Sequence, residues 1–279
     1  MKSVLEVIQA TVPYFQKCGV ENPRLNIEHL LAHVLRKKRM DLYLEFDRPL
    51  GDQDLEPLRE LVKRRAQGEP LQHLLGTVEF LGRSFVCDKR ALVPRPETEQ
   101  LCELLLTDCG SRIGSGRVLD VGTGSGVIAL TLAAEWPDAQ VEAVDISHDA
   151  LTLARENAAR LGLTARVQFS DANLLADVAG EFQLIVANLP YVDPAAESSL
   201  AREVRHDPPL ALYGGAGGLE LLRQLIAQAT HHLRGLLALE LGYDQASSVC
   251  ETLTGHNYQD IRVLRDYQGR QRFVFATYG

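Results

Sequence analysis

The residues best suited to chemistry stand in one short run, Asn188-Leu189-Pro190-Tyr191, directly after an apolar stretch. The side-chain oxygen of Asn188 and the main-chain carbonyl of Leu189 are two acceptors that can together bind both N–H groups of a planar NH2. Pro190 stiffens the turn, and the ring of Tyr191 can stack on a flat group. This pattern predicts that an amide or exocyclic amine is oriented toward an electrophilic methyl group, with no covalent intermediate.

A second chemical feature is the glycine-rich run Gly122-Thr123-Gly124-Ser125-Gly126, which separates an apolar stretch from a helical pattern. Glycines allow a tight turn and a close ligand, and the first N–H groups of the following helix are free to bind it. Asp145 ends the next apolar stretch, 21 residues after Gly124. A carboxylate at that position faces ribose hydroxyls in a doubly wound sheet, so the two features predict a nucleoside-containing cofactor.

The glycine run by itself is compatible with two cofactor classes. Gly124-x-Gly126-x-x-Ala129 satisfies the dinucleotide fingerprint, which would indicate an NAD-dependent dehydrogenase. Asp120, inside the preceding apolar stretch, would instead place an acid where a pyrophosphate needs none and where a sulfonium ligand with an ammonium group would benefit. A glycine-rich turn that binds no ligand is the purely structural interpretation.

These residues require elements that bring them to one edge of a sheet. Apolar strand candidates alternate with helical patterns, and they are predicted at Arg117–Val121, Gln140–Asp145, Arg166–Phe169, Phe182–Ala187, Leu236–Leu241, Asp260–Leu264 and Arg272–Thr277. Helices are predicted between them at Gly126–Trp136, His148–Leu161, Gly218–Leu233 and Asp244–Leu253. The alternation predicts an α/β fold with a mostly parallel seven-stranded sheet, helices on both faces and a final antiparallel hairpin.

The chain before this region has a different pattern, and the whole chain therefore divides into three predicted parts. Residues 1–75 predict a small helical domain, with a capping box at Ser3 and Glu6 and a helix capped by Asp52. Residues 76–95 change to short Val-, Phe- and Leu-rich runs around Gly82 and predict a hairpin linker. Residues 96–279 form the predicted cofactor-binding domain.

Composition narrows the class of protein further. The 279 residues are 46% hydrophobic and 24% charged, which argues against a disordered chain, and no apolar run approaches the length of a membrane span. A net charge of −8 makes direct nucleic-acid binding unfavourable. The five cysteines are odd in number and unpaired in pattern, which favours a reducing, cytoplasmic compartment. His29 and His33 have no third ligand nearby in sequence, so no metal site is expected.

Taken together, these motifs resemble the bacterial peptide-chain release factor glutamine methyltransferases of the HemK/PrmC type. The resemblance rests on the glycine run with Asp120, on Asp145, on Asn188–Tyr191 and on the segment Leu92-Val93-Pro94-Arg95-Pro96-Glu97-Thr98-Glu99. It covers nearly the whole chain. It implies a class I, Rossmann-like methyltransferase domain with S-adenosyl-L-methionine as donor, S-adenosyl-L-homocysteine as product and the glutamine of a release factor's Gly-Gly-Gln loop as acceptor.

The resemblance also implies roles for single residues. Gly122, Thr123, Gly124, Ser125 and Gly126 would cradle the methionine part of the donor, and Asp145 would bind the ribose. Asp171 and Ala172 would lie beside the adenine, and Asn188, Leu189, Pro190 and Tyr191 would hold the glutamine amide. The protein would act as a monomer on release factors, without nucleic acid or membrane.

One position departs from the family pattern, because Leu189 replaces the usual proline of Asn-Pro-Pro-Tyr. Asn-Leu-Pro-Tyr is also similar to the ribosomal RNA adenine dimethylases, whose acceptor is an N6 amine. Those enzymes carry helices after the methyltransferase core, whereas this chain has them in front. Adenine N6 methylation of ribosomal RNA and glutamine methylation of a ribosomal protein are the two alternative activities.

Overall fold

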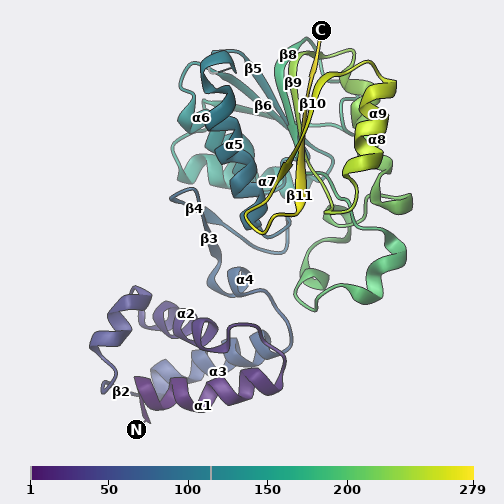
Figure 1. The fold of residues 1–279 in the computed structure, drawn as a ribbon. Coiled ribbons are helices and arrows are strands. Elements are labelled where there is room, and N and C mark those ends of the chain that lie inside the picture. The colour runs from purple at the N-terminus through teal and green to yellow at the C-terminus, as the bar shows by residue number, and fades with distance from the viewer. Residues whose placement is uncertain (1, 114) are drawn as a thin grey trace. The chain divides into compact units, whose positions relative to one another are not determined.

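The computed structural model describes residues 2–113 and 115–279, and their chain forms two compact units (Figure 1). The first unit contains the chain up to Thr77 together with Ala201–His206, and the second contains Val78–Leu200 and Asp207–Gly279. The sequence does not indicate that residues 201–206 join the first unit. The predicted domain boundaries after residues 75 and 95 stay a prediction.

The first unit is helical. Its elements are β1 (Lys2–Ser3), α1 (Val4–Lys17), α2 (Pro23–Leu35), η1 (Arg39–Leu44), β2 (Pro49–Leu50), α3 (Asp52–Ala66) and α4 (Leu71–Leu75). The predicted capping box of α1 is confirmed, since the Ser3 hydroxyl accepts from Glu6 N and the Glu6 carboxylate accepts from Ser3 N. The predicted cap of α3 is wrong by one residue, because Gly51 is the cap and Asp52 is already helical.

The second unit is built around a seven-stranded sheet with the order β10-β11-β9-β8-β5-β6-β7. Its strands are β5 (Arg117–Val121), β6 (Gln140–Asp145), β7 (Val167–Asp171), β8 (Phe182–Ala187), β9 (Leu233–Glu240), β10 (Gln259–Arg265) and β11 (Gln271–Tyr278). The pairs among strands β5 to β9 are all parallel, and β11 pairs antiparallel with both β9 and β10. The expected fold class is therefore confirmed, including the final hairpin.

Helices cover both faces of this sheet (Figure 1). Apolar residues of α5 (Pro96–Ile113), α6 (Val127–Glu135) and α7 (His148–Arg160) share one core with one face of the strands. Residues of α8 (Glu220–Ala229) and α9 (Ala246–Gly255) share the core on the other face. Short 3-10 turns occupy the connection from β8 to α8, namely η2 (Pro194–Ser199), η3 (Val204–His206), η4 (Pro209–Ala211) and η5 (Ala216–Gly218).

The predicted hairpin is present as β3 (Thr77–Phe80) and β4 (Arg83–Val86). Its two-residue turn consists of Leu81 and Gly82, both with positive φ, which is the backbone that a tight hairpin of this twist needs.

Within residues 2–113 and 115–279, none of the helices combines the length and the apolar character that crossing a bilayer demands.

Candidate active site

A cavity of about 180 Å³ opens in the second unit where strands β5, β6 and β8 end. The strand register explains why the predicted site residues meet there. Val121 of β5 lies opposite Val144 of β6 and Ala187 of β8. The residues that follow these three are Gly122, Asp145 and Asn188, and all three line the cavity.

The glycine loop forms one wall of the cavity. Gly122, Gly124 and Gly126 all have positive φ, a conformation that side chains with a Cβ rarely adopt. The N–H groups of Gly122 and Thr123 both donate to the carbonyl of Val144, at 2.9 and 3.0 Å, which ties the loop to β6. A Cβ on Gly122 would lie only 2.8 Å from Cδ2 of Leu189, so this glycine also makes room for the Asn-Leu-Pro-Tyr segment.

The side chain of Asp120 stabilises the glycine loop by hydrogen bonds. The carboxylate is fully buried, and its Oδ2 accepts hydrogen bonds from Thr123 Oγ1 at 2.6 Å and Ala129 N at 3.1 Å. Burial raises the pKa of Asp120 to about 7, although both hydrogen bonds favour the ionised form. The expectation that Asp120 presents its charge to a ligand is wrong, because the side chain bonds to the loop and lies outside the cavity wall.

Asp145 joins the glycine loop to the turn before α7. Its Oδ2 accepts from Gly124 N at 2.8 Å and its Oδ1 accepts from Ser147 N at 2.9 Å. Burial raises the pKa of Asp145, and the hydrogen bonds from Ser147 and Gly124 oppose that rise. Each carboxylate oxygen has a further lone pair, so Asp145 can accept ribose hydroxyls while it holds the loop.

Asn188 follows β8 and is half-buried at the cavity wall. Its Nδ2 donates to Thr98 Oγ1 at 2.9 Å, and Thr98 Oγ1 donates to Glu240 Oε2 at 2.8 Å. Thr98 and Glu240 are 3% and 1% exposed. Burial raises the pKa of Glu240 to about 7. The side-chain nitrogen of Asn188 is therefore engaged by protein, and its oxygen is the group left for a ligand.

A segment before α5 covers another part of the cavity. Leu92 and Pro94 line it, and Pro208 and Leu210 line it from the connection after β8. Asp207, which is buried, links the two segments, since Oδ1 accepts from Val93 N at 3.1 Å and Oδ2 accepts from Arg95 Nη2 at 2.6 Å. The ion pair between Arg95 and Asp207 therefore ties the segment before α5 to the connection after β8.

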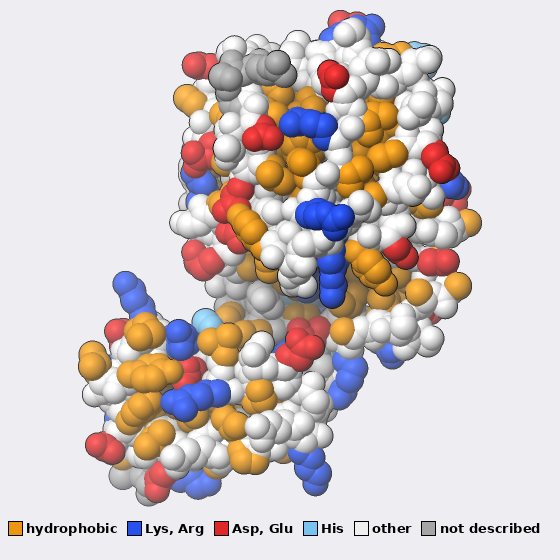
Figure 2. All heavy atoms as spheres, in the orientation of Figure 1, with side chains coloured by type: hydrophobic (Ala, Val, Ile, Leu, Met, Phe, Trp, Pro, Cys, Tyr) orange, Lys and Arg blue, Asp and Glu red, His pale blue; other side chains and the backbone are white. Residues whose placement is uncertain are grey.

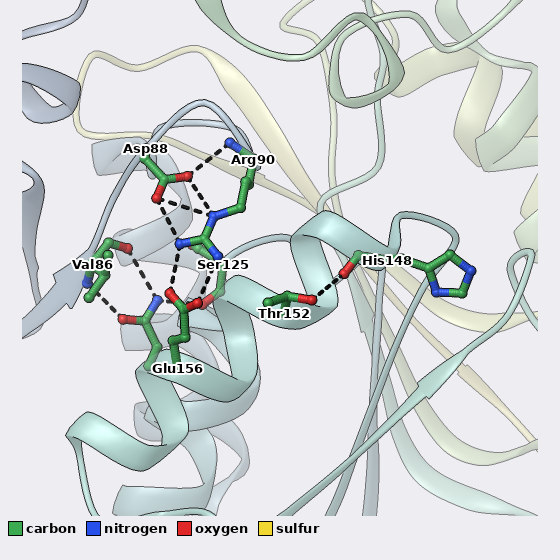
Figure 3. A network of polar contacts seen from close by, with 8 residues as sticks. Val86, Asp88, Arg90, Ser125, His148, Thr152 and Glu156 are labelled. Atoms are coloured by element: carbon green, nitrogen blue, oxygen red, sulfur yellow. Dashed lines mark hydrogen bonds and ion pairs between the residues drawn. The ribbon is translucent and has the colours of Figure 1, made fainter.

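Residues 87–91, which lead from β4 to the cavity, are held to α7 by a network of polar contacts (Figure 3). Arg90 contacts both oxygens of Glu156, at 2.8 and 2.6 Å, and also binds Asp88. Asn157, fully buried, accepts from Val86 N at 2.6 Å and donates to Ser125 O at 2.9 Å. One amide side chain thus joins the hairpin to the glycine loop.

Three of the predicted site residues do not line the cavity. Gly126 caps α6, where a Cβ would meet Leu130 and Ala154 at 3.0 and 3.1 Å, so its smallness serves packing. Asp171 ends β7 half-exposed and contacts His148 Nδ1 at 3.1 Å. Tyr191 is held at its carbonyl by Gln245 Nε2 at 3.0 Å. The other predicted residues all line it, namely Gly122, Thr123, Gly124, Ser125, Asp145, Ala172, Asn188, Leu189 and Pro190.

Sequence reasoning missed several residues of the site. Thr98 stands within the Leu92–Glu99 segment without a pattern that marks it, and Glu240 stands in a predicted apolar strand, although a carboxylate at the end of such a strand is itself a signal. Gly214 and Gly218 were also missed. A Cβ on Gly214 would lie 2.3 Å from Pro190 O, and one on Gly218 would lie 2.0 Å from Tyr191 O. In the described parts of the chain, no group of three or more His, Cys, Asp or Glu side chains is arranged to hold a metal.

Comparison with known families agrees with this layout. A family model described as the PrmC N-terminal domain matches residues 6–76, and one described as the methyltransferase small domain matches residues 97–212. Among solved structures, a ribosomal protein L11 methylase from Lactobacillus delbrueckii subsp. bulgaricus is 28% identical with a TM-score of 0.50. The match covers 66% of this chain and 81% of that one.

Curated relatives match over almost the whole chain. A release factor glutamine methyltransferase of Chlorobaculum tepidum is 40% identical, covering 97% of this chain and 95% of that protein. The protein of the same name from Deinococcus radiodurans is 44% identical, covering 93% of each. With this extent of similarity, a class I methyltransferase sheet and a helical unit in front, the chain belongs to the release factor glutamine methyltransferase family.

Proposed function

We propose that this protein transfers a methyl group from S-adenosyl-L-methionine to the side-chain nitrogen (N5) of the glutamine in the Gly-Gly-Gln motif of peptide-chain release factors. The observation that carries the proposal is the placement of Asn188 and the glycine loop on one cavity, at neighbouring strand ends. An acceptor amide and a nucleoside donor can meet only where both binding features open into the same space.

The residues of the cavity fit the donor. Gly124 lines the cavity with φ of +57° and no side chain, so a ligand can approach its backbone closely. Asp145 offers carboxylate lone pairs for ribose hydroxyls, and Ala172 and Ile146 offer apolar surface for a base. When bound, S-adenosyl-L-methionine supplies an electrophilic methyl group on a positively charged sulfur.

The acceptor side of the cavity suits a carboxamide. The oxygen of Asn188 and the carbonyl of Leu189 can accept the two N–H groups of one NH2, which fixes its plane. Leu189 keeps this capacity despite replacing proline, because its side chain is buried in the core beside Gly122 while a main-chain carbonyl remains. Pro94 and Leu210 supply apolar walls that reduce the access of water to the reacting groups.

The first unit has a surface suited to a protein partner. Its exposed hydrophobic side chains include Leu25, Met40, Tyr43 and Leu44, the last with 87% of its surface exposed. Figure 2 shows hydrophobic side chains among Lys and Arg on one face of this unit. Exposed apolar residues rimmed by charge are typical of protein interaction sites.

We also propose that the protein is a monomer in the cytoplasm. Analytical sedimentation would test the oligomeric state, and cell fractionation would test the compartment.

The decisive experiment supplies labelled S-adenosyl-L-methionine with one acceptor at a time. The acceptors are a release factor, the same factor with the Gly-Gly-Gln glutamine changed to alanine, ribosomal RNA, and ribosomal proteins. The proposal predicts label on the unaltered factor alone. Label confined to RNA would indicate the adenine N6 activity, and label confined to ribosomal protein would indicate the other glutamine acceptor. Either result would overturn the proposal.

A further inference from the structure

A buried polar chain runs inward from the cavity wall, and the proposed reaction does not by itself require it. It runs from Asn188 at the cavity wall, through the hydroxyl of Thr98 on the first turn of α5, to the carboxylate of Glu240 at the end of β9. Pro96 begins α5, and Thr98 N donates to Arg95 O at 3.0 Å, so the backbone of this turn is fixed. The three residues come from three separate segments of the chain.

The direction of the hydrogen bonds matters for catalysis. A threonine hydroxyl has one proton and two lone pairs. Because Thr98 donates its only proton to Glu240, it has only lone pairs to offer Asn188. The NH2 group of Asn188 can bind those lone pairs, whereas its oxygen would be repelled by them. Among the described residues, none donates a hydrogen bond to Asn188 Oδ1.

We propose that Thr98, backed by Glu240, is the positioning residue that holds the Asn188 amide with its oxygen toward the acceptor nitrogen. An inverted amide would present a donor to the donors of a glutamine NH2, and that contact is repulsive. The inference rests on the proposed function and assigns Thr98 to the orientation of the acceptor, not to the binding of the methyl donor.

Thr98→Val tests this assignment, because it keeps the shape of the side chain and removes the hydroxyl. We expect kcat for release factor methylation to fall about 10- to 100-fold, the size of effect that small misplacement of a reacting group produces. The Kd of the donor, measured by calorimetry, should change less than about threefold, because the substitution disturbs the orientation of the acceptor and not the binding of the donor. Thr98→Ser restores the hydroxyl and should recover most of kcat.

Thr131→Val is the matched control. Thr131 is also fully buried in the second unit, but its hydroxyl has no hydrogen-bond partner among the described residues. Removal of that hydroxyl should leave kcat unchanged. If Thr131→Val lowered kcat as much as Thr98→Val, the loss would reflect general disturbance of the core, and the assignment would be wrong.

A double-mutant cycle with Asn188→Ala separates positioning from a structural role. If Thr98 acts through Asn188, Thr98→Val should have no further effect on kcat once Asn188 is alanine. Equal losses in both backgrounds, or failure of serine to rescue, would overturn the inference. Failure of the proposed function is distinguishable, because the unaltered enzyme would then leave the release factor glutamine unmethylated.

Discussion

Glu240→Gln should alter the pH dependence of stability in a direction that the structure fixes. Burial raises the pKa of Glu240 from its ordinary value of 4.5 to about 7. Between these two values the folded protein keeps a proton on this carboxyl that the unfolded chain has released. The free energy of unfolding therefore falls as the pH rises from 4.5 toward 7. Glutamine has nothing to ionise, so the variant loses this contribution.

The magnitude follows from the size of the pKa difference. At about 1.4 kcal/mol per unit of pKa, the rise in the pKa of Glu240 corresponds to roughly 3 kcal/mol. Glu240→Gln should therefore be more favourable, relative to the unaltered protein, at pH 8 than at pH 5 by about that amount. The buried carboxyl of Asp120 contributes in the same direction, but it is present in both proteins and drops out of the difference.

Denaturation followed by tryptophan fluorescence measures this effect. Trp136, the only tryptophan in the sequence, is buried in the core of the second unit and reports on the unfolding of that unit. Glu251→Gln, a change at an exposed position of α9, is the control and should keep the pH dependence of the unaltered protein. A stability difference between Glu240→Gln and the unaltered protein that stays constant from pH 5 to pH 8 would refute the reasoning.

Further predictions concern single residues of the site. Asn188→Ala should lower kcat more than it weakens donor binding in calorimetry, and a loss confined to donor affinity would contradict the role of Asn188. Asp145→Ala should weaken donor binding at least about tenfold, because it removes ribose acceptors and two loop contacts. Asn157→Ala should reduce the free energy of unfolding by about 1–3 kcal/mol, since Val86 and Ser125 lose buried partners. Gly214→Ala should destabilise the second unit by about 1–3 kcal/mol, because its Cβ would overlap Pro190 O, whereas Gly255→Ala, with open space at its Cβ, should not.

The sequence predicted the sheet well because buried parallel strands are continuous apolar runs. Arg117–Val121, Gln140–Asp145 and Phe182–Ala187 were predicted with the bounds that the structure has. Residues at the ends of those strands or immediately after them could also be placed, since parallel strands end at one edge. Gly122, Asp145 and Asn188 were found for that reason.

Contacts between segments far apart in the chain could not be predicted in this way. Thr98 meets Glu240 only because α5 packs beside β9, a pairing that no local pattern encodes. Asp207 binds Arg95 across more than a hundred residues, and Asp171 contacts His148 at the end of its strand instead of lining the cavity. The role of Asp120 was misjudged for a similar reason, because a carboxylate inside a strand can point into the core as well as toward a ligand.

The most direct test of the account is a crystal structure of the enzyme with S-adenosyl-L-homocysteine and a peptide that contains Gly-Gly-Gln. The account predicts that the glutamine side-chain nitrogen lies within hydrogen-bond distance of both Asn188 Oδ1 and the carbonyl of Leu189, in the cavity beside the glycine loop. A glutamine bound elsewhere, or an Asn188 amide turned with its nitrogen toward the peptide, would contradict it.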